Sequence, residues 1–182
     1  MSAYPAARPT PGFLTLSTAR EVGVLLALSL LFPFLIHLIP VPEDARLGQR
    51  LLPMFYAPLL GVLWGRARAA TIVAVLAPWL NWLLTRHPSP PSATLMSLEL
   101  FTFTLAVATL RARAGLRWWL ALPAYIIGRA ATIILAALVP TLNGHRALLD
   151  WALNSTLQAL PGLAVLVLLT LLVQRIYPPT PA

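Results

Sequence analysis

Long apolar runs separated by short polar breaks dominate this chain. The runs predict six transmembrane helices, at residues 22–39, 51–65, 69–85, 93–110, 118–139 and 148–174. The breaks are polar or rich in Pro or Gly, as is typical between helices, and fall at residues 40–44, 65–68, 86–91, 111–115 and 143–146. We therefore expect an all-α, polytopic integral membrane protein with one six-helix membrane domain at 20–177, a lead at 1–19 and a tail at 178–182.

The second predicted span is unusually short. Its length of about fifteen residues would cover only about 22 Å at 1.5 Å per residue, which is less than the roughly 30 Å of the hydrocarbon layer. Pro53 and Pro58 each lack a backbone donor. Unpaired backbone groups survive at membrane depth only where protein or a cavity supplies partners. We expect this span to be packed inside the protein or interrupted.

Composition agrees with a membrane location. Hydrophobic residues make up 59% of the 182 residues, charged residues make up 10%, and the mean hydropathy is +0.80. Soluble domains carry about 25% charged residues, so soluble enzymes and disordered chains are excluded. The chain has no cysteine, which removes disulfides, thiolate nucleophiles and thiolate metal sites. No two histidines have metal-ligand spacing, and we expect neither a metal ion nor a cofactor.

The net charge of +8 comes entirely from arginine, since none of the thirteen basic residues is lysine. We interpret this charge as membrane topology and not as nucleic-acid binding, because cytoplasmic loops retain basic residues. With the N-terminus inside, eight arginines fall in the inner loops and four in the outer loops. The inner set is Arg8, Arg20, Arg66, Arg68, Arg111, Arg113, Arg117 and Arg175, and the outer set is Arg46, Arg50, Arg86 and Arg146. Both termini are therefore expected in the cytoplasm.

Strongly polar residues within the spans share the outer half of the membrane, with Arg129 and Gln158 expected near the midplane. They are Asn81, Glu99, Arg129, Asn154 and Gln158, whereas the inner half holds little beyond Ser and Thr hydroxyls, which can bond their own helix backbone. Ionisable groups at depth usually face a cavity or a partner. The pattern predicts a pocket that opens to the outside and is closed below. Trp79, Trp82 and Tyr125 would supply its aromatic walls.

Structural explanations exist for the same residues. Glu99 and Arg129 could form an ion pair that ties two helices together, with or without a ligand. Trp79 and Trp82 lie near a span end, where tryptophan often anchors a helix at the membrane surface. The same interfacial role is expected for Trp64, Trp118, Trp119 and Trp151.

Small residues form a second pattern on the first predicted span. Gly23 and Ala27 are four residues apart, and this spacing makes a flat helix face that another helix can approach closely. Gly61 and Gly65 repeat the spacing on the second span. We expect part of these spans to contact a neighbouring helix, within the chain or beyond it.

Several short segments, in order along the chain, carry a resemblance to a known family. Residues 52–61 read Leu-Pro-Met-Phe-Tyr-Ala-Pro-Leu-Leu-Gly, and residues 65–78 form a small-residue helix that ends at a proline. Ser-Leu-Glu-Leu at 97–100, Gly-Arg at 128–129 and Leu-Pro-Gly at 160–162 follow. Together these segments resemble one branch of the substrate-binding S components of energy-coupling factor (ECF) transporters, which capture vitamins and related micronutrients. That branch usually carries His where this chain has Phe55, which implies a different ligand contact there.

The resemblance implies six helices and an outward-facing pocket under the loop that joins the first two spans. It also implies small residues on the first span that dock the transmembrane coupling subunit, and Gly23 and Ala27 fall at those positions. That subunit would connect to two cytoplasmic ATPases in the plasma membrane of a bacterium or archaeon. This chain has no G-x-x-x-x-G-K-[ST] phosphate loop. We expect a receptor for a small nutrient, with Asn81, Trp79, Trp82, Glu99, Tyr125, Arg129, Asn154 and Gln158 as its substrate-binding residues.

Two other classes of protein share some of these sequence features. A small membrane scaffold, similar to the rod-shape membrane proteins, would use the same flat helix faces to dock partners and would need no ligand. An intramembrane enzyme would need a nucleophile and a base at depth, but the chain has no H-E-x-x-H, no G-x-S-x-G and no second buried carboxylate beside Glu99. We therefore do not expect an enzyme, and the scaffold stays as the alternative.

Overall fold

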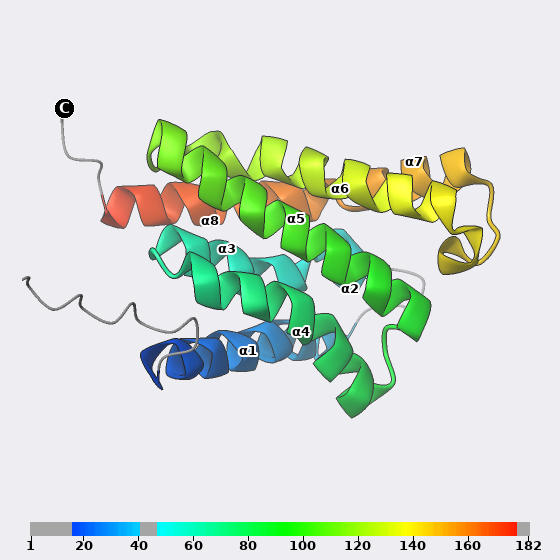
Figure 1. The fold of residues 1–182 in the computed structure, drawn as a ribbon, viewed down its shortest axis with the longest axis horizontal. Coiled ribbons are helices and arrows are strands. Elements are labelled where there is room, and N and C mark those ends of the chain that lie inside the picture. The colour runs from blue at the N-terminus through cyan, green and yellow to red at the C-terminus, as the bar shows by residue number, and fades with distance from the viewer. Residues whose placement is uncertain (1–15, 41–46, 178–182) are drawn as a thin grey trace, which may run out of the picture.

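The computed structural model describes residues 16–40 and 47–177, and every regular element in these ranges is a helix (Figure 1). This confirms the all-α prediction. Most of the predicted lead, the whole tail, Arg8 and Arg46 lie outside the described residues. The elements are α1 (Leu16–His37), α2 (Leu47–Leu51), η2 (Pro53–Phe55), α3 (Tyr56–Leu63), α4 (Ala67–Thr85), α5 (Pro90–Ala114), η3 (Trp118–Leu120), α6 (Ala121–Leu138), η4 (Pro140–Asn143), α7 (Leu148–Gln158) and α8 (Leu160–Ile176).

Four stretches of the described chain are long and apolar enough to cross a membrane. They are α1, α4, α5 and the continuous stretch of η3 with α6. Helices α7 and α8 meet at a bend of 45° and together would make a fifth. Pro161 lies in the first turn of α8, where its missing N–H has no helical partner to lose. These spans are consistent with a membrane protein and match five of the six predicted positions.

The remaining predicted span, at 51–65, is broken into α2, η2 and α3. Leu52 takes a left-handed backbone conformation, with φ 53° and ψ 44°, directly before Pro53. The hydroxyl of Tyr56 donates a hydrogen bond to the carbonyl of Leu51, which the break leaves without a helical partner. Helix α3 is almost entirely buried among α1, α4, α5 and α8. The expectation that this span is interrupted and packed inside the protein is confirmed.

Two glycines allow helices to approach closely. A Cβ at Gly128 of α6 would lie 2.8 Å from the carbonyl oxygen of Glu99 on α5. A Cβ at Gly162 of α8 would lie 2.7 Å from the carbonyl oxygen of Arg50, at the end of α2. Both contacts are with backbone atoms, so any larger residue would push the elements apart. These glycines set the distances of α5 to α6 and of α8 to the broken second segment.

The two ends of the bundle differ in charge. The start of α1, the α3–α4 and α5–η3 connections and the end of α8 lie at one end of the molecule (Figure 1). We call this the arginine-rich end, since it carries Arg20, Arg66, Arg68, Arg111, Arg113, Arg117 and Arg175. The α4–α5 connection, η4 and the start of α7 lie at the opposite end, with Arg86 and Arg146.

Candidate functional site

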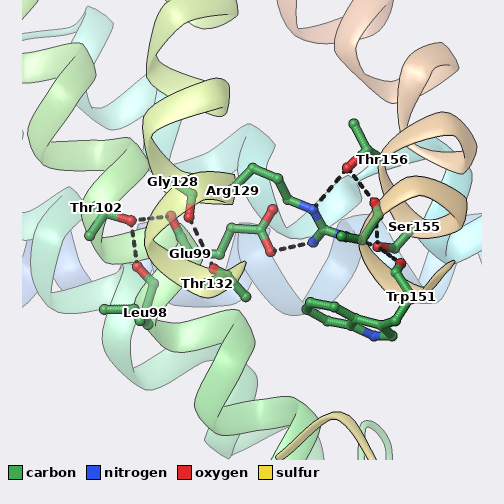
Figure 2. A network of polar contacts seen from close by, with 10 residues as sticks. Leu98, Glu99, Thr102, Gly128, Arg129, Thr132, Trp151, Ser155 and Thr156 are labelled. Atoms are coloured by element: carbon green, nitrogen blue, oxygen red, sulfur yellow. Dashed lines mark hydrogen bonds and ion pairs between the residues drawn. The ribbon is translucent and has the colours of Figure 1, made fainter. Parts of the chain in front are cut away.

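A buried ion pair joins α5 to α6. A terminal guanidinium nitrogen of Arg129 donates to Oε2 of Glu99 over 3.1 Å, and the two side chains are only 11% and 9% exposed (Figure 2). Gly128 precedes Arg129, and its lack of a side chain brings the two helices close enough for this contact. The structure therefore contains the ion pair that was one of the two alternatives for these residues.

Arg129 also reaches the third helix of the site, α7. Its Nε donates to the Thr156 hydroxyl over 3.2 Å, and its second terminal nitrogen donates to the Ser155 hydroxyl. The guanidinium lies over the Trp151 ring, 5.1 Å from its centroid (Figure 2). Helix α7 has no buried residue. Arg129 therefore makes three side-chain contacts that attach α7 to α6, and α7 also contacts α2 and α8.

Glu99 lies in the half of α5 nearer the opposite end, and Arg129 lies at the middle of α6. Glu99 and Arg129 are each nine residues from the helix end on that side, which is about 14 Å along the axis. In the half near the arginine-rich end, the hydroxyls of Thr71, Thr109 and Thr170 each donate to the carbonyl four residues earlier in their own helix. The predicted self-bonding of these hydroxyls is confirmed. The same half also contains the Arg111 guanidinium, which donates to the carbonyl of Val62, and the buried side-chain oxygen of Gln174, so polar groups are not confined to the opposite half.

The α7 partners of Arg129 were missed as site residues in the sequence analysis. Trp151 and Ser155 are four residues apart and share one helix face, and Thr156 adjoins them. The predicted pair, Asn154 and Gln158, has the same spacing on a face turned by about 60°. Asn154 is exposed and Gln158 is half-buried, and neither belongs to the Arg129 network. The i, i+4 signal was present for both faces, but it does not say which face points inward.

Tyr125 lies one turn before Arg129 and is buried. Its ring lies 5.9 Å from that of Phe55, which in turn packs edge-on against Phe103 at 5.0 Å. Phe55 occupies the position where the resembling branch carries His. The η2 turn thus presents an apolar ring to Tyr125, and this aromatic cluster joins η2 to α5 and α6.

The predicted residues on α4 form a separate group. The Trp79 and Trp82 rings meet edge to face at 6.1 Å, and the Arg86 guanidinium lies 5.6 Å from the centroid of Trp82. The Asn81 amide donates to the carbonyl of His87 over 2.8 Å. Asn81 therefore ties the end of α4 to the start of the α4–α5 connection.

A groove of about 620 Å³ runs between α1 and α4. A cavity of this size can hold a small organic ligand. Its lining is mainly apolar, with polar groups at the end nearest the α4–α5 connection: Ala27, Leu30, Leu31, Pro33, Phe34, Asn81, Leu84, Thr85 and His87. Neither Glu99 nor Arg129 lines it. The eight predicted substrate-binding residues are thus divided between α4 and the α5–α6–α7 site.

The predicted docking residues lie on an open face of α1. Gly23 and Ala27 are both exposed, and a Cβ at Gly23 would meet nothing within 4 Å. Gly61 behaves differently, because a Cβ there would lie 2.8 Å from the Leu25 side chain of α1. Gly61 of α3 is used within the chain, whereas Gly65 lies in the α3–α4 connection with a positive φ and packs against no helix closely. The small residues of α1 leave a flat surface open.

Within residues 16–40 and 47–177, no group of three or more His, Cys, Asp or Glu side chains is placed to hold a metal ion. Comparison with protein-family models, with curated proteins and with solved structures gives no match to this chain. Any assignment of function therefore depends on the site itself and on the motifs in the sequence.

Proposed function

We propose that the chain is the substrate-binding S component of an ECF-type importer. It would capture a vitamin or related micronutrient from outside and deliver it through a transmembrane coupling subunit and two cytoplasmic ATPases. The observation that carries the proposal is the buried Glu99–Arg129 ion pair, which has hydroxyl and aromatic partners on α7. Among the described residues, the other ion pair, Arg66 with Glu21, is more exposed.

The proposal includes six membrane crossings with both termini in the cytoplasm. The α2–η2–α3 segment would be the sixth crossing, with η2 and α3 shielded from lipid by the helices around them and α2 less buried. The arginine-rich end would then face the cytoplasm, in agreement with the retention of basic residues on that side. The buried ion pair would lie in the outer half, where a nutrient arrives.

Ligand binding at Arg129 would require an exchange of partners. All three guanidinium nitrogens already donate, to Glu99, Ser155 and Thr156. A ligand carboxylate binds a guanidinium more strongly than a neutral hydroxyl does, since both partners are charged. It would replace Ser155 and Thr156 as α7 moves aside, and Glu99 would keep Arg129 in place.

The remaining predicted residues would contribute from two places. Asn154 and Gln158 on α7, and Asn81 in the separate α1–α4 groove, would read the hydrogen-bonding edges of the ligand. A single ligand would contact both groups only after the helices rearrange. Tyr125, Trp79 and Trp82 would supply aromatic faces. The apolar lower half gives a polar solute no route through the chain, so release to the cytoplasm would need the coupling subunit, docked on the open α1 face at Gly23 and Ala27.

Ligand retention tests the nutrient-binding proposal. Full-length protein, purified in mild detergent, would be assayed for co-purifying small molecules by mass spectrometry and titrated with a panel of water-soluble vitamins. Arg129→Ala and Asn154→Ala should both weaken binding, whereas Arg175→Ala at the other end of the bundle should not. Unchanged vitamin binding in both site variants would refute the assignment.

A membrane scaffold is the second candidate, and one observation favours it. Each of the three guanidinium nitrogens of Arg129 donates a hydrogen bond within the chain, as a structural tie would require. A scaffold predicts that Glu99 and Arg129 affect folding only and that no vitamin in the panel binds the purified chain. Retention of a vitamin that depends on the exposed Asn154 would separate the two, since that side chain has little to contribute to folding.

A further inference from the structure

A small recess lies at the arginine-rich end, between the start of α1 and the α3–α4 connection. Its volume is about 230 Å³, and it is lined by Arg20, Glu21, Val24, Leu25, Trp64 and Arg66. Ligand pockets for drug-sized molecules usually span about 300–1,000 Å³. The recess is therefore suited to a group smaller than a whole nutrient, such as a lipid headgroup phosphate.

The charge of the recess favours an anion. Glu21 forms an ion pair with Arg66 at 2.8 Å. Within the described part of the chain Arg20 has no ion-pair partner. Two arginines and one glutamate leave one net positive charge, which complements the single negative charge of a phosphodiester. Arginine suits a phosphate oxygen pair because its guanidinium donors form a planar fork.

The rest of the recess favours a lipid over a soluble anion. Val24 and Leu25 make an apolar floor, and Trp64, which is 47% exposed, stands at the end of α3 where amphipathic rings meet the membrane surface. From this floor an exposed apolar stripe continues along α1 through Val24, Ala27 and Leu31. The spacing of three and four residues keeps these side chains on one helix face.

The stripe leads into the larger groove. Ala27 and Leu31 belong to the stripe and also line the 620 Å³ groove between α1 and α4. The groove continues to Phe34. Ten residues separate Val24 from Phe34, or about 15 Å of helix, which equals the depth of one leaflet of a roughly 30 Å hydrocarbon layer. A charged recess and an apolar track one leaflet long match the two ends of a phospholipid.

We infer that the α1–α4 seam binds an anionic phospholipid, with its phosphate in the Arg20–Trp64–Arg66 recess and an acyl chain along Val24, Ala27 and Leu31. The orientation proposed above places this recess at the cytoplasmic leaflet, where anionic lipids are found. The lipid covers the same face of α1 that is proposed to dock the coupling subunit. It therefore occupies that face in the free chain.

Native mass spectrometry of the full-length chain in mild detergent tests the inference. The probes are phosphatidylglycerol and phosphatidylcholine with identical acyl chains. Phosphatidylglycerol should bind more tightly, and Arg20→Gln should lower its apparent affinity about five-fold, the effect of one cation near an anionic headgroup. Arg175→Gln removes a charge at the same end but outside the recess. It should change the affinity by less than about two-fold, because salt screens charges that are not in contact with the lipid.

Glu21→Gln should change the phosphatidylglycerol affinity in the opposite direction. It removes the carboxylate that neutralises Arg66, so it should raise the phosphatidylglycerol affinity by about the same factor. A variant that merely unfolds could not produce this gain. Equal losses in Arg20→Gln and Arg175→Gln would overturn the inference in favour of a diffuse basic surface. Displacement of the lipid by inorganic phosphate or by glycerophosphoglycerol would overturn it in favour of a soluble-anion site.

Discussion

The guanidinium of Arg129 lies 5.1 Å from the centroid of the Trp151 ring, and the same group donates to two hydroxyls of α7 (Figure 2). Helix α7 buries no residue of its own and is separated from α8 by a 45° bend. One buried side chain on α6 therefore links a loosely packed helix to the body of the protein. This arrangement would let α7 move without disturbing the bundle.

Weakening the α7 contacts should loosen that helix selectively. Trp151→Leu combined with Thr156→Ala removes the ring under Arg129 and one of its acceptors. We expect hydrogen exchange at 148–158 to rise by about ten-fold or more, since roughly 1–2 kcal/mol of local stability is lost, while exchange in α5 and α6 stays nearly unchanged. Thr109→Ala, at an exposed and self-bonded hydroxyl, is the control. A uniform rise across all helices would contradict the local attachment.

The Glu99–Arg129 pair should show strong coupling in a double-mutant cycle. Glu99→Gln or Arg129→Gln alone leaves a buried charge without its partner, and such changes typically cost about 3–5 kcal/mol. The double variant should lose clearly less than the sum of the single changes, because no charge is then left unpaired. Unfolding of each variant in mixed detergent micelles would supply the free energies. Additive losses would mean that the pair contributes little energy.

Gly128→Ala should destabilise the fold. The new Cβ would lie 2.8 Å from the carbonyl of Glu99 and 3.3 Å from the Cβ of Phe103, so α5 and α6 must separate at a cost of about 1–3 kcal/mol. Gly23→Ala is the matched control, since a Cβ there meets nothing within 4 Å and removing a helical glycine is neutral or stabilising. Thermal unfolding of the two variants side by side is the measurement. Equal melting temperatures would show that the α5–α6 contact is not tight.

Tyr56→Phe tests the break between α2 and η2. The variant removes the hydroxyl that donates to the carbonyl of Leu51, at the point where the left-handed Leu52 ends α2. Leaving that carbonyl without its donor should cost about 1–3 kcal/mol in unfolding free energy. Leu51 adjoins Gly162, so the loss should be accompanied by faster hydrogen exchange at the start of α8. A stability equal to that of the parent chain would show that water already serves this carbonyl.

Local physical chemistry explains what could be predicted from the sequence. Apolar run length and Pro- and Gly-rich breaks are properties of the nearest residues, so four spans and a bent fifth fall at predicted positions. The short length and two prolines of 51–65 led to the correct expectation of an interrupted, buried segment. The cost of burying Glu99 and Arg129 predicted that each needs a partner or a cavity, and the ion pair was among the alternatives.

Only the tertiary structure decided how each helix is turned about its own axis. A leucine is as well solvated by lipid tails as by a protein interior, so the apolar pattern of a membrane helix does not mark its inward face. The sequence analysis therefore placed Asn154 and Gln158 in the site and Trp151 at the membrane surface, whereas Arg129 contacts Trp151 and Ser155. The groove between α1 and α4 depends on helices that are far apart in sequence. Gly61 contacts Leu25 of α1 and Ala70 of α4, but its place in a small-residue pattern does not say which helices it brings together.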